Sequence, residues 1–210
     1  MTTQRFDYVV VGAGAAGCAV ANRLSEDPSV RVLLLEAGGR DWNPFIHMPV
    51  GFTKLTGPKV NWEFETVPQA QLNNRPMWYP QGRTIGGSTS INAMIYIRGH
   101  REDYEAWAAA GNKEWGYDQV LPFFRKAEHN ERLNDEFHGS DGPMNVTEQI
   151  QHNELSKAFV RAAQELGLTY TPDFNGASQD GVGYYDVTQK RARRESASTA
   201  YLRPARAAAT

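Results

Sequence analysis

Cysteine is nearly absent from this sequence, and so is any long apolar run. Cys18 is the only cysteine among the 210 residues, which excludes an intramolecular disulfide. No stretch approaches the roughly 18 apolar residues that a membrane-spanning helix needs, and no basic and apolar leader precedes Phe6. A reducing, cytoplasmic location is therefore expected, with peripheral membrane contact left open because short apolar loops leave a weak trace.

An excess of charge of either sign is also missing. The formal net charge is −2, and the basic residues are scattered apart from the cluster KRARR at residues 190–194. No nucleic-acid partner is therefore expected. With 40% hydrophobic and 22% charged residues, the composition is that of a folded globular protein with one large domain or one and a half.

The segment up to Glu36 has the pattern of a strand, a helix and a second strand. Residues 6–17, FDYVVVGAGAAG, open with an apolar run typical of a strand buried on both faces of a parallel sheet. Small and apolar residues within 15–25 suit a helix packed closely on that sheet, and residues 30–36, VRVLLLE, form the second run. The short crossover predicts an α/β fold with a parallel sheet.

The remaining sequence is less regular. Residues 38–82 are rich in Pro, Gly, Asn and aromatic side chains, which predicts an extended, ordered excursion, and loops of that length are usually functional or disordered. An acidic first turn at Glu102 and Asp103, Asp118 as a helix N-cap and Gly167 as a terminator accompany the expected helices. We expect helices at 103–110, 117–130 and 155–166, the last with an apolar stripe, and a strand beginning within 143–146.

A dinucleotide-binding motif fits this strand, helix, strand context. Gly12, Gly14 and Gly17 form GAGAAG at the start of the helix, and Glu36 closes the second strand. Gly12 allows the tight turn, Gly14 lets a pyrophosphate approach the backbone, and Gly17 lets the helix pack closely on the sheet. The helix N-terminus attracts phosphate, and Glu36 would accept hydrogen bonds from a ribose diol, which favours FAD or NAD over NADP. In isolation the glycines would indicate only a tight turn.

A second glycine segment follows at residues 82–99, GRTIGGSTSINAMIYIRG. Its simplest interpretation is a tight turn into a buried strand. Its hydroxyls and the amide of Asn92 would also allow a second close backbone approach to a long cofactor. An NAD enzyme has no evident need of this segment, whereas a cofactor with a bulky tricyclic ring does, so the spacing favours FAD.

Together these stretches resemble the glucose-methanol-choline (GMC) oxidoreductases, especially their bacterial alcohol dehydrogenase and choline dehydrogenase branch. The resemblance covers nearly the whole chain. Further matching stretches are LLLEAG (33–38), NPFIHMP (43–49), NWEFETVPQ (61–69), INAMIYIRGHREDY (91–104) and DFNGASQDGVGYYDVTQK (173–190). The first family signature is matched by Gly82, Arg83, Ile85, Gly86, Gly87, Ser88, Thr89, Ile91, Asn92, Tyr96, Gly99 and Glu105.

The resemblance implies a Rossmann-like FAD-binding domain, incomplete in this chain, with the beginning of a substrate-binding domain. The FAD-binding part would comprise residues 1–152, with the excursion at 38–82. Residues 153–190 would begin the substrate-binding domain, and residues 191–210 would return to the FAD-binding domain.

The resemblance and the motifs together indicate which residues hold FAD. Some relatives attach the flavin covalently through a histidine just before the asparagine of the signature, and here that position is Ile91, so non-covalent FAD is expected. The expected cofactor-binding residues are Gly12, Gly14, Ala15, Ala16, Gly17, Glu36, Ala37, Arg83, Thr84, Gly87, Ser88, Asn92, Ala93, Met94 and Ile95.

The implied activity is oxidation of a primary alcohol to an aldehyde by hydride transfer to the flavin, with a quinone or another non-NAD acceptor. Aliphatic alcohols are the first expectation for the substrate and choline the second. Peripheral contact with the inner membrane through the acceptor is the alternative location.

No catalytic residue is assigned within these 210 residues. In the family the catalytic histidine lies far towards the C-terminus of a longer chain, so a complementary C-terminal polypeptide is the expected partner and this chain alone is expected to be inactive. The alternative is a non-catalytic flavin-binding or partner-binding fragment. The histidines present, each expected to lie on the surface or in a loop, are His47, His100, His129, His138 and His152.

Overall fold

The computed structural model describes residues 4–208 and divides into two compact units. The first unit contains the chain up to Met94 and the segment from Arg191 onwards, and the second is Ile95–Lys190. The structure is mixed helix and strand, as an α/β protein requires. The flavin-binding and substrate-binding domain boundaries stay predictions, because compactness assigns no role to either unit.

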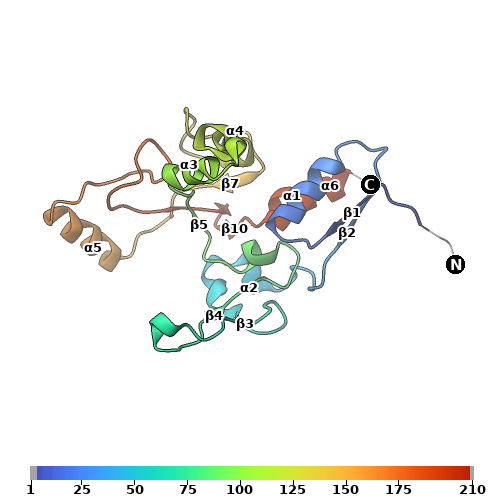
Figure 1. Cartoon of the computed structure of the whole chain (residues 1–210), viewed down its shortest axis with the longest axis horizontal. Coiled ribbons are helices and arrows are strands. Elements are labelled where there is room, and N and C mark those ends of the chain that lie inside the picture. Colours follow the sequence, from blue (N-terminus) through green and yellow to red (C-terminus); the bar gives the residue numbers. More distant parts are fainter. Residues whose placement is uncertain (1–3, 209–210) are drawn as a thin grey trace. The chain divides into compact units, whose positions relative to one another are not determined.

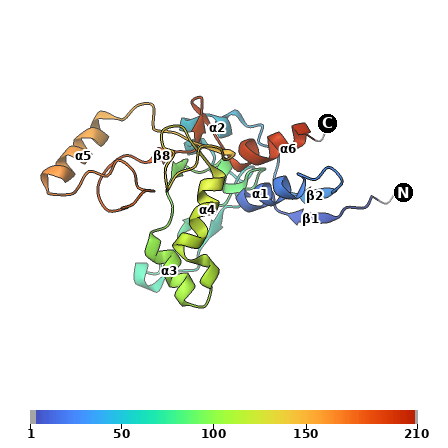
Figure 2. The same ribbon diagram turned by 90° about the horizontal axis from the view of Figure 1, so that it is seen from above.

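The first unit begins with the predicted strand, helix and strand. Strand β1 (Tyr8–Val11) pairs in parallel with β2 (Val32–Leu35), in a register that places Tyr8 opposite Val32. Helix α1 (Ala15–Leu24) connects them and lies along the pair (Figures 1 and 2). Its small side chains permit this packing, with Cys18 and Ala21 buried.

The expectation that the first strand is buried on both faces is wrong for this chain. Tyr8 is 49% exposed, Val9 56% and Val11 82%. Among the described residues the sheet has only these two strands, so α1 covers one face and no other sheet neighbour covers the rest. An apolar run predicts a strand that can be buried, but whether it is buried depends on the segments that pack on it.

Residues 38–82 form the predicted irregular and ordered excursion. The side chain of Asn43 caps the short helix α2 (Pro44–His47) by accepting from the Phe45 N–H at 3.0 Å. The elements here are α2 (Pro44–His47), the 3-10 turns η1 (Pro49–Lys54) and η2 (Ala70–Leu72), and the antiparallel pair β3 (Phe64–Glu65) and β4 (Trp78–Tyr79).

The C-terminal segment completes the first unit. It contains β10 (Arg193–Arg194), the π-helical turn η5 (Ser198–Leu202) and α6 (Arg203–Ala208). The turn η5 packs on α1, where the Asn22 amide donates to the Tyr201 carbonyl oxygen at 2.9 Å. Helix α6 follows η5 in the chain and lies beside α1 (Figures 1 and 2).

The second unit is built from short strands and three helices of nine residues or more among its described residues. The buried ion pair of Arg98 with Glu128 and the buried side chain of His138 form part of its interior. Its elements are β5 (Ile95–Tyr96) antiparallel to β8 (Asp186–Val187), α3 (Arg101–Ala109), η4 (Lys113–Trp115), α4 (Tyr117–Ala127), β6 (Glu128–Asn130) parallel to β7 (Met144–Val146), α5 (Glu154–Glu165) and β9 (Gln189–Lys190).

The helix predictions in this unit hold, with two corrections to α4. Helix α3 has the expected acidic first turn. Helix α4 is capped by Gly116 rather than Asp118, and it ends at Ala127 because the chain turns there into β6. Gly167, with φ +91°, terminates α5 as expected.

The predicted apolar stripe of α5 exists but is not buried. Leu155 is 81% exposed, Phe159 70% and Leu166 84%, while Val160 is buried. The helical period is correct, but the surrounding described chain covers only the Val160 side. Within residues 4–208, none of the helices combines the length and the apolar character needed to cross a membrane.

Candidate functional site: a glycine-lined cradle

The first glycine loop joins β1 to α1. Gly12 has φ +94°, a left-handed conformation that favours glycine, and Gly14 is the N-cap of α1. A Cβ on Gly17 would overlap the Gly12 carbonyl oxygen, so only glycine permits this approach of helix to loop. A Cβ on Gly14 would meet no described protein atom within 4 Å. Gly14 therefore faces open space.

The N-terminus of α1 next to Gly14 is electrostatically suited to an anion. No side chain caps it, and its first turn contains no acidic residue. Ala15 and Ala16, which form that turn, are both exposed. The N–H groups of a first helical turn have no partner within the helix, and they carry the positive end of the helix dipole. A phosphate could approach here without displacing a carboxylate.

The second glycine segment packs directly on the first. Its 3-10 turn η3 (Gly87–Ser90) follows Gly86, and the Gly86 N–H donates to the Ala13 carbonyl oxygen at 2.7 Å. A Cβ on Gly87 would lie 2.7 Å from the Gly14 Cα, closer than real side chains approach. Both Gly86 and Gly87 have positive φ. The two segments thus meet backbone to backbone, which places both beside the same space.

The Glu36 side chain connects the loop after β2 to the glycine loop by hydrogen bonds. Its Oε2 accepts from the Ala13 N–H and its Oε1 from the Gly38 N–H, each at 2.7 Å. Glu36 also lines a cavity of about 320 Å³ with Ala13 and Ile85. Exposed Ala37 lines a separate hollow of about 330 Å³ with Arg83. The carboxylate is held beside both glycine segments.

Arg83 and Thr84 extend the cradle. Thr84 is 1% exposed, and its hydroxyl donates to the Gly39 carbonyl oxygen at 2.9 Å. The guanidinium carbon of Arg83 lies 5.0 Å from the centre of the Trp62 ring. The Arg83 Nε is buried and has no hydrogen-bond partner among the described residues. An unpaired buried donor is costly, and a bound acceptor would remove that cost.

The cradle continues through Ser88 to Met94. Ser88 Oγ accepts from the Gly82 N–H at 3.0 Å. Asn92 and Ala93 are exposed, whereas Met94 is 3% exposed and adopts φ +64°. Such a backbone conformation in a residue other than glycine persists only when its surroundings hold it, and it is common at ligand sites. Ile95, the last predicted site residue, is 50% exposed and begins the second unit.

All the predicted site residues except Ile95 lie in the first unit, and the contacts above bring them together; Ile95 belongs to the second unit. It also adds Arg194, which sequence reasoning missed: the guanidinium donates to Thr89 O at 3.2 Å and to Asn92 Oδ1 at 2.6 Å. Nothing in the sequence distinguishes Arg194 from Arg191 and Arg193 in the same basic cluster, so its role could not be predicted. Cys18 lies under the glycine loop, where its thiol donates to the Ala13 carbonyl oxygen at 3.2 Å, and burial raises its pKa to about 11, which keeps it protonated near neutral pH.

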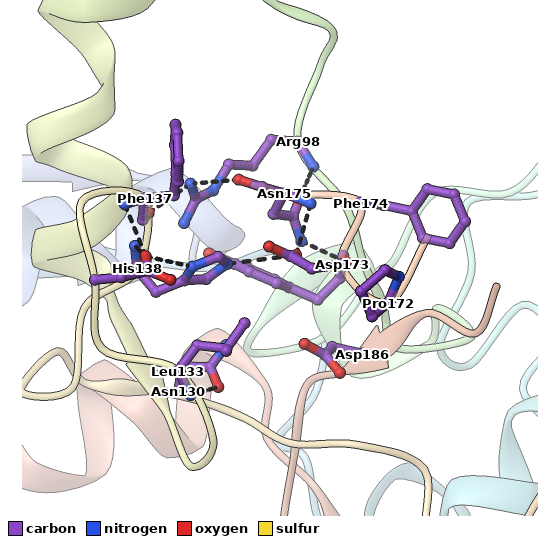
Figure 3. A network of polar contacts seen from close by, with 12 residues as sticks. Arg98, Asn130, Leu133, Phe137, His138, Pro172, Asp173, Phe174, Asn175 and Asp186 are labelled. Atoms are coloured by element: carbon purple, nitrogen blue, oxygen red, sulfur yellow. Dashed lines mark hydrogen bonds and ion pairs between the residues drawn. The ribbon is translucent and has the colours of Figure 1, made fainter. Parts of the chain in front are cut away.

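The histidines lie outside this cradle. His47 Nε2 lies 2.7 Å from the Asp41 carbonyl oxygen, His100 caps α3, and the His152 ring stacks on Tyr184 with 3.6 Å between centroids. The expectation of a surface or loop position is wrong for His129, which lies half-buried in β6. His138 lies in a loop as expected, but its side chain is fully buried, with the Asp173 carboxylate beside its ring (Figure 3) and the Asp135 carboxylate 2.9 Å from its Nδ1.

Comparison with known proteins places the chain in a family. The family model described as GMC oxidoreductase matches residues 6–210. The chain belongs to the GMC oxidoreductases. It is 53% identical over 199 residues to an alcohol dehydrogenase [acceptor] of Pseudomonas putida, covering 94% of this chain and 36% of that protein. It is 45% identical over 210 residues to the human mitochondrial choline dehydrogenase, covering 95% of this chain and 35% of that protein.

Solved structures agree with the fold. Pyridoxine 4-oxidase from Mesorbium loti superposes with a TM-score of 0.89 at 38% identity, over 94% of this chain and 39% of that one. A formate oxidase of Aspergillus oryzae RIB40, studied for FAD modification, gives 0.85 at 28% identity, over 95% of this chain and 37% of that one. The chain spans about 36% of the length of the first curated relatives it matches.

Proposed function

We propose that this chain holds FAD non-covalently in an oxidoreductase that converts a primary alcohol to an aldehyde. The observation that carries the proposal is the backbone contact between the two glycine segments, with Gly14 facing open space. FAD has a polar pyrophosphate and ribityl chain and a flat apolar ring. A cradle made of glycine backbone, hydroxyls and a buried apolar Met94 suits both parts of that molecule.

The chain's own residues would position the cofactor. The uncapped first turn of α1 would receive the pyrophosphate, and Glu36 would accept from the adenosine ribose. Arg83 would offer its unpaired Nε. The segment from Thr84 to Ile95 would line the ribityl chain and the ring. Bound FAD would supply the hydride acceptor, and the protein would supply position and electrostatics.

Non-covalent attachment is proposed from Ile91. An alkyl side chain at this position offers no nucleophile to the flavin, whereas a histidine would. A structural relative, a formate oxidase, is named for FAD modification, so the attachment is worth measuring directly. The test is denaturation in acid followed by filtration: yellow colour in the filtrate supports the proposal, and colour retained on the protein contradicts it.

The substrate we propose is an aliphatic primary alcohol, with choline as the second candidate. The alcohol dehydrogenase relative is 53% identical and the choline dehydrogenases about 44%. A quaternary ammonium also needs an aromatic or acidic cage. The electrons would pass to a quinone or another non-NAD acceptor, in the cytoplasm or at the inner face of a membrane.

The base that takes the alcohol proton would come from a complementary C-terminal polypeptide, so the chain alone would be inactive. A rival proposal is a fragment that binds flavin or a partner without catalysis. Purification followed by intact mass, visible spectrum and analysis of co-eluting polypeptides separates them. Flavin together with a second polypeptide that restores alcohol oxidation supports the enzyme; a colourless, monomeric, folded chain contradicts it.

The flavin site itself is tested with a matched pair of substitutions. Gly14→Val should lower flavin retention at least about tenfold, because the new side chain meets no described protein atom and would occupy the space proposed for pyrophosphate; its poorer N-cap should lower the melting temperature of the apoprotein only slightly. Gly17→Val should instead destabilise the apoprotein, since its side chain would overlap Gly12. Flavin content and apoprotein melting are measured for both, and unchanged flavin content in Gly14→Val would count against the site.

A further inference from the structure

Arg194 is a buried cation held by neutral groups. It is 2% exposed, and its Nε donates to the Ile46 carbonyl oxygen at 2.7 Å. Its Nη1 donates to the Thr89 carbonyl oxygen and to Asn92 Oδ1. Burial lowers its pKa to about 10, which still leaves it charged near neutral pH. Burying a charge is unfavourable, so a side chain kept here needs a reason.

Asn92 connects Arg194 to a strained residue. The same Asn92 Oδ1 that accepts from Arg194 at 2.6 Å also accepts from the Met94 N–H at 3.0 Å. Met94 has φ +64°, which is unfavourable for a residue with a side chain, and it is buried. A hydrogen bond from a charged donor is stronger than one between neutral groups. The Arg194 guanidinium therefore fixes the orientation of the Asn92 amide, and through it the conformation of the Met94 turn.

Further contacts attach the same C-terminal segment to the glycine segment. The Ala197 N–H donates to Thr89 Oγ1 at 2.9 Å, and Thr89 Oγ1 donates to the Gly86 carbonyl oxygen at 2.6 Å. These contacts hold η3 from its buried side, while Asn92 and Ala93 remain exposed. Arg194 thus holds the turn that contains exposed Asn92 and Ala93, although it is itself buried.

We propose that Arg194 is a positioning residue that sets the Asn92 amide and the left-handed Met94 turn in the geometry that receives the flavin. The inference rests on the proposed function for the identity of the ligand, but not for the conformation of the turn. Lysine cannot replace arginine here, because one ammonium group cannot span acceptors on Ile46, Thr89 and Asn92 as a planar guanidinium does. A purely structural role would require only that the segment stay folded.

The first experiment measures the turn in the chain without flavin. The protein is labelled with ¹³C and ¹⁵N methionine, and the Met94 Cα and Cβ shifts report its backbone conformation. Arg194→Lys should move these shifts towards ordinary backbone values, whereas Arg193→Lys, a change at the exposed neighbour, should leave them in place. Met94 shifts unaltered in Arg194→Lys would overturn the proposal.

A second variant keeps the test decisive if Arg194→Lys does not fold. Asn92→Ala retains Arg194 but removes the shared acceptor, so it should release Met94 in the same way. A left-handed Met94 in folded Asn92→Ala would overturn the proposal as well.

The second experiment measures FAD dissociation constants by flavin fluorescence. Arg194→Lys should weaken binding at least about tenfold, the effect of losing one charge-assisted hydrogen bond. In the double variant with Asn92→Ala the two effects should be less than additive, since both act through one oxygen. Full additivity would overturn the link through Asn92. Absence of FAD binding in the unchanged chain would contradict the proposed function, and the Met94 shifts would still decide the role of Arg194.

Discussion

Arg98 and Glu128 form a buried ion pair in the second unit. Their side chains are 3% and 0% exposed, and Arg98 Nη2 lies 2.7 Å from Glu128 Oε2. Arg98, seen beside Phe137 in Figure 3, also donates from its Nη1 to the Phe137 carbonyl oxygen at 2.8 Å. The Gly139 N–H donates to Glu128 Oε2 at 3.2 Å. Such a pair is tolerated in the interior only because both charges are paired and hydrogen-bonded.

Removing one member of this pair should be severe. Arg98→Met leaves the Glu128 carboxylate uncompensated, and we expect a loss of about 3–5 kcal/mol of unfolding free energy. The control is Arg101→Met, which breaks an exposed pair with Asp118 and should cost less than about 1 kcal/mol. Urea unfolding followed by a signal from the second unit measures both, and equal effects of the two substitutions would contradict the buried pair's role.

At the scale of elements, His138 joins the segment after β6 to the segment before β8. Its Nδ1 lies 2.9 Å from Asp135 Oδ1, and its Nε2 lies 3.5 Å from Asp173 Oδ1, which is longer than a good hydrogen bond but close enough for attraction between charges. Burial by itself would lower the pKa of His138, but the two carboxylates outweigh it and raise the pKa above 6.5. The imidazolium form is therefore favoured by the fold.

This pKa shift predicts a pH dependence with a definite sign. A raised folded-state pKa contributes stability that is complete below pH 6.5 and is lost as pH rises through the folded-state value. We expect the stability difference between the natural chain and His138→Gln to shrink as pH rises from 6 to about 9. Unfolding by urea at each pH measures it. A difference that stays constant or grows with pH would contradict this assignment.

The elements also show how far the sequence could predict this structure. Periodicity located α1, α3 and α5, because local residue patterns set helices. It misjudged the end of α4 and the burial of β1 and α5, because burial depends on which distant chain covers a face. The glycine motifs predicted two backbone segments that approach a cofactor; that Gly87 also packs on Gly14 could not be predicted, because it depends on the folded chain. Arg194 could not be predicted, because its partners come together only in the folded chain.

On the scale of the whole molecule, the proposed flavin site belongs almost entirely to the first unit. Ligand binding to the folded state stabilises it by about 2.7 kcal/mol when the ligand is at 100 times its dissociation constant. Added FAD should therefore slow amide hydrogen exchange in residues 12–17 and 82–92 while residues 131–143 and α5 exchange as before. Exchange followed by mass spectrometry measures this. Equal protection in all these segments, or protection limited to the second unit, would contradict the location of the site.

The contact of Gly87 with the Gly14 Cα has a consequence for how such sequences vary. The two positions are remote in the chain, yet a side chain at position 87 would displace the loop that contains position 14. A library that randomises both codons and is selected for flavin retention should return glycine at both, and an alanine at 87 only with compensating changes in the loop. The residues tolerated in one loop therefore depend on the sequence of the other, even though the two loops contact each other through backbone alone.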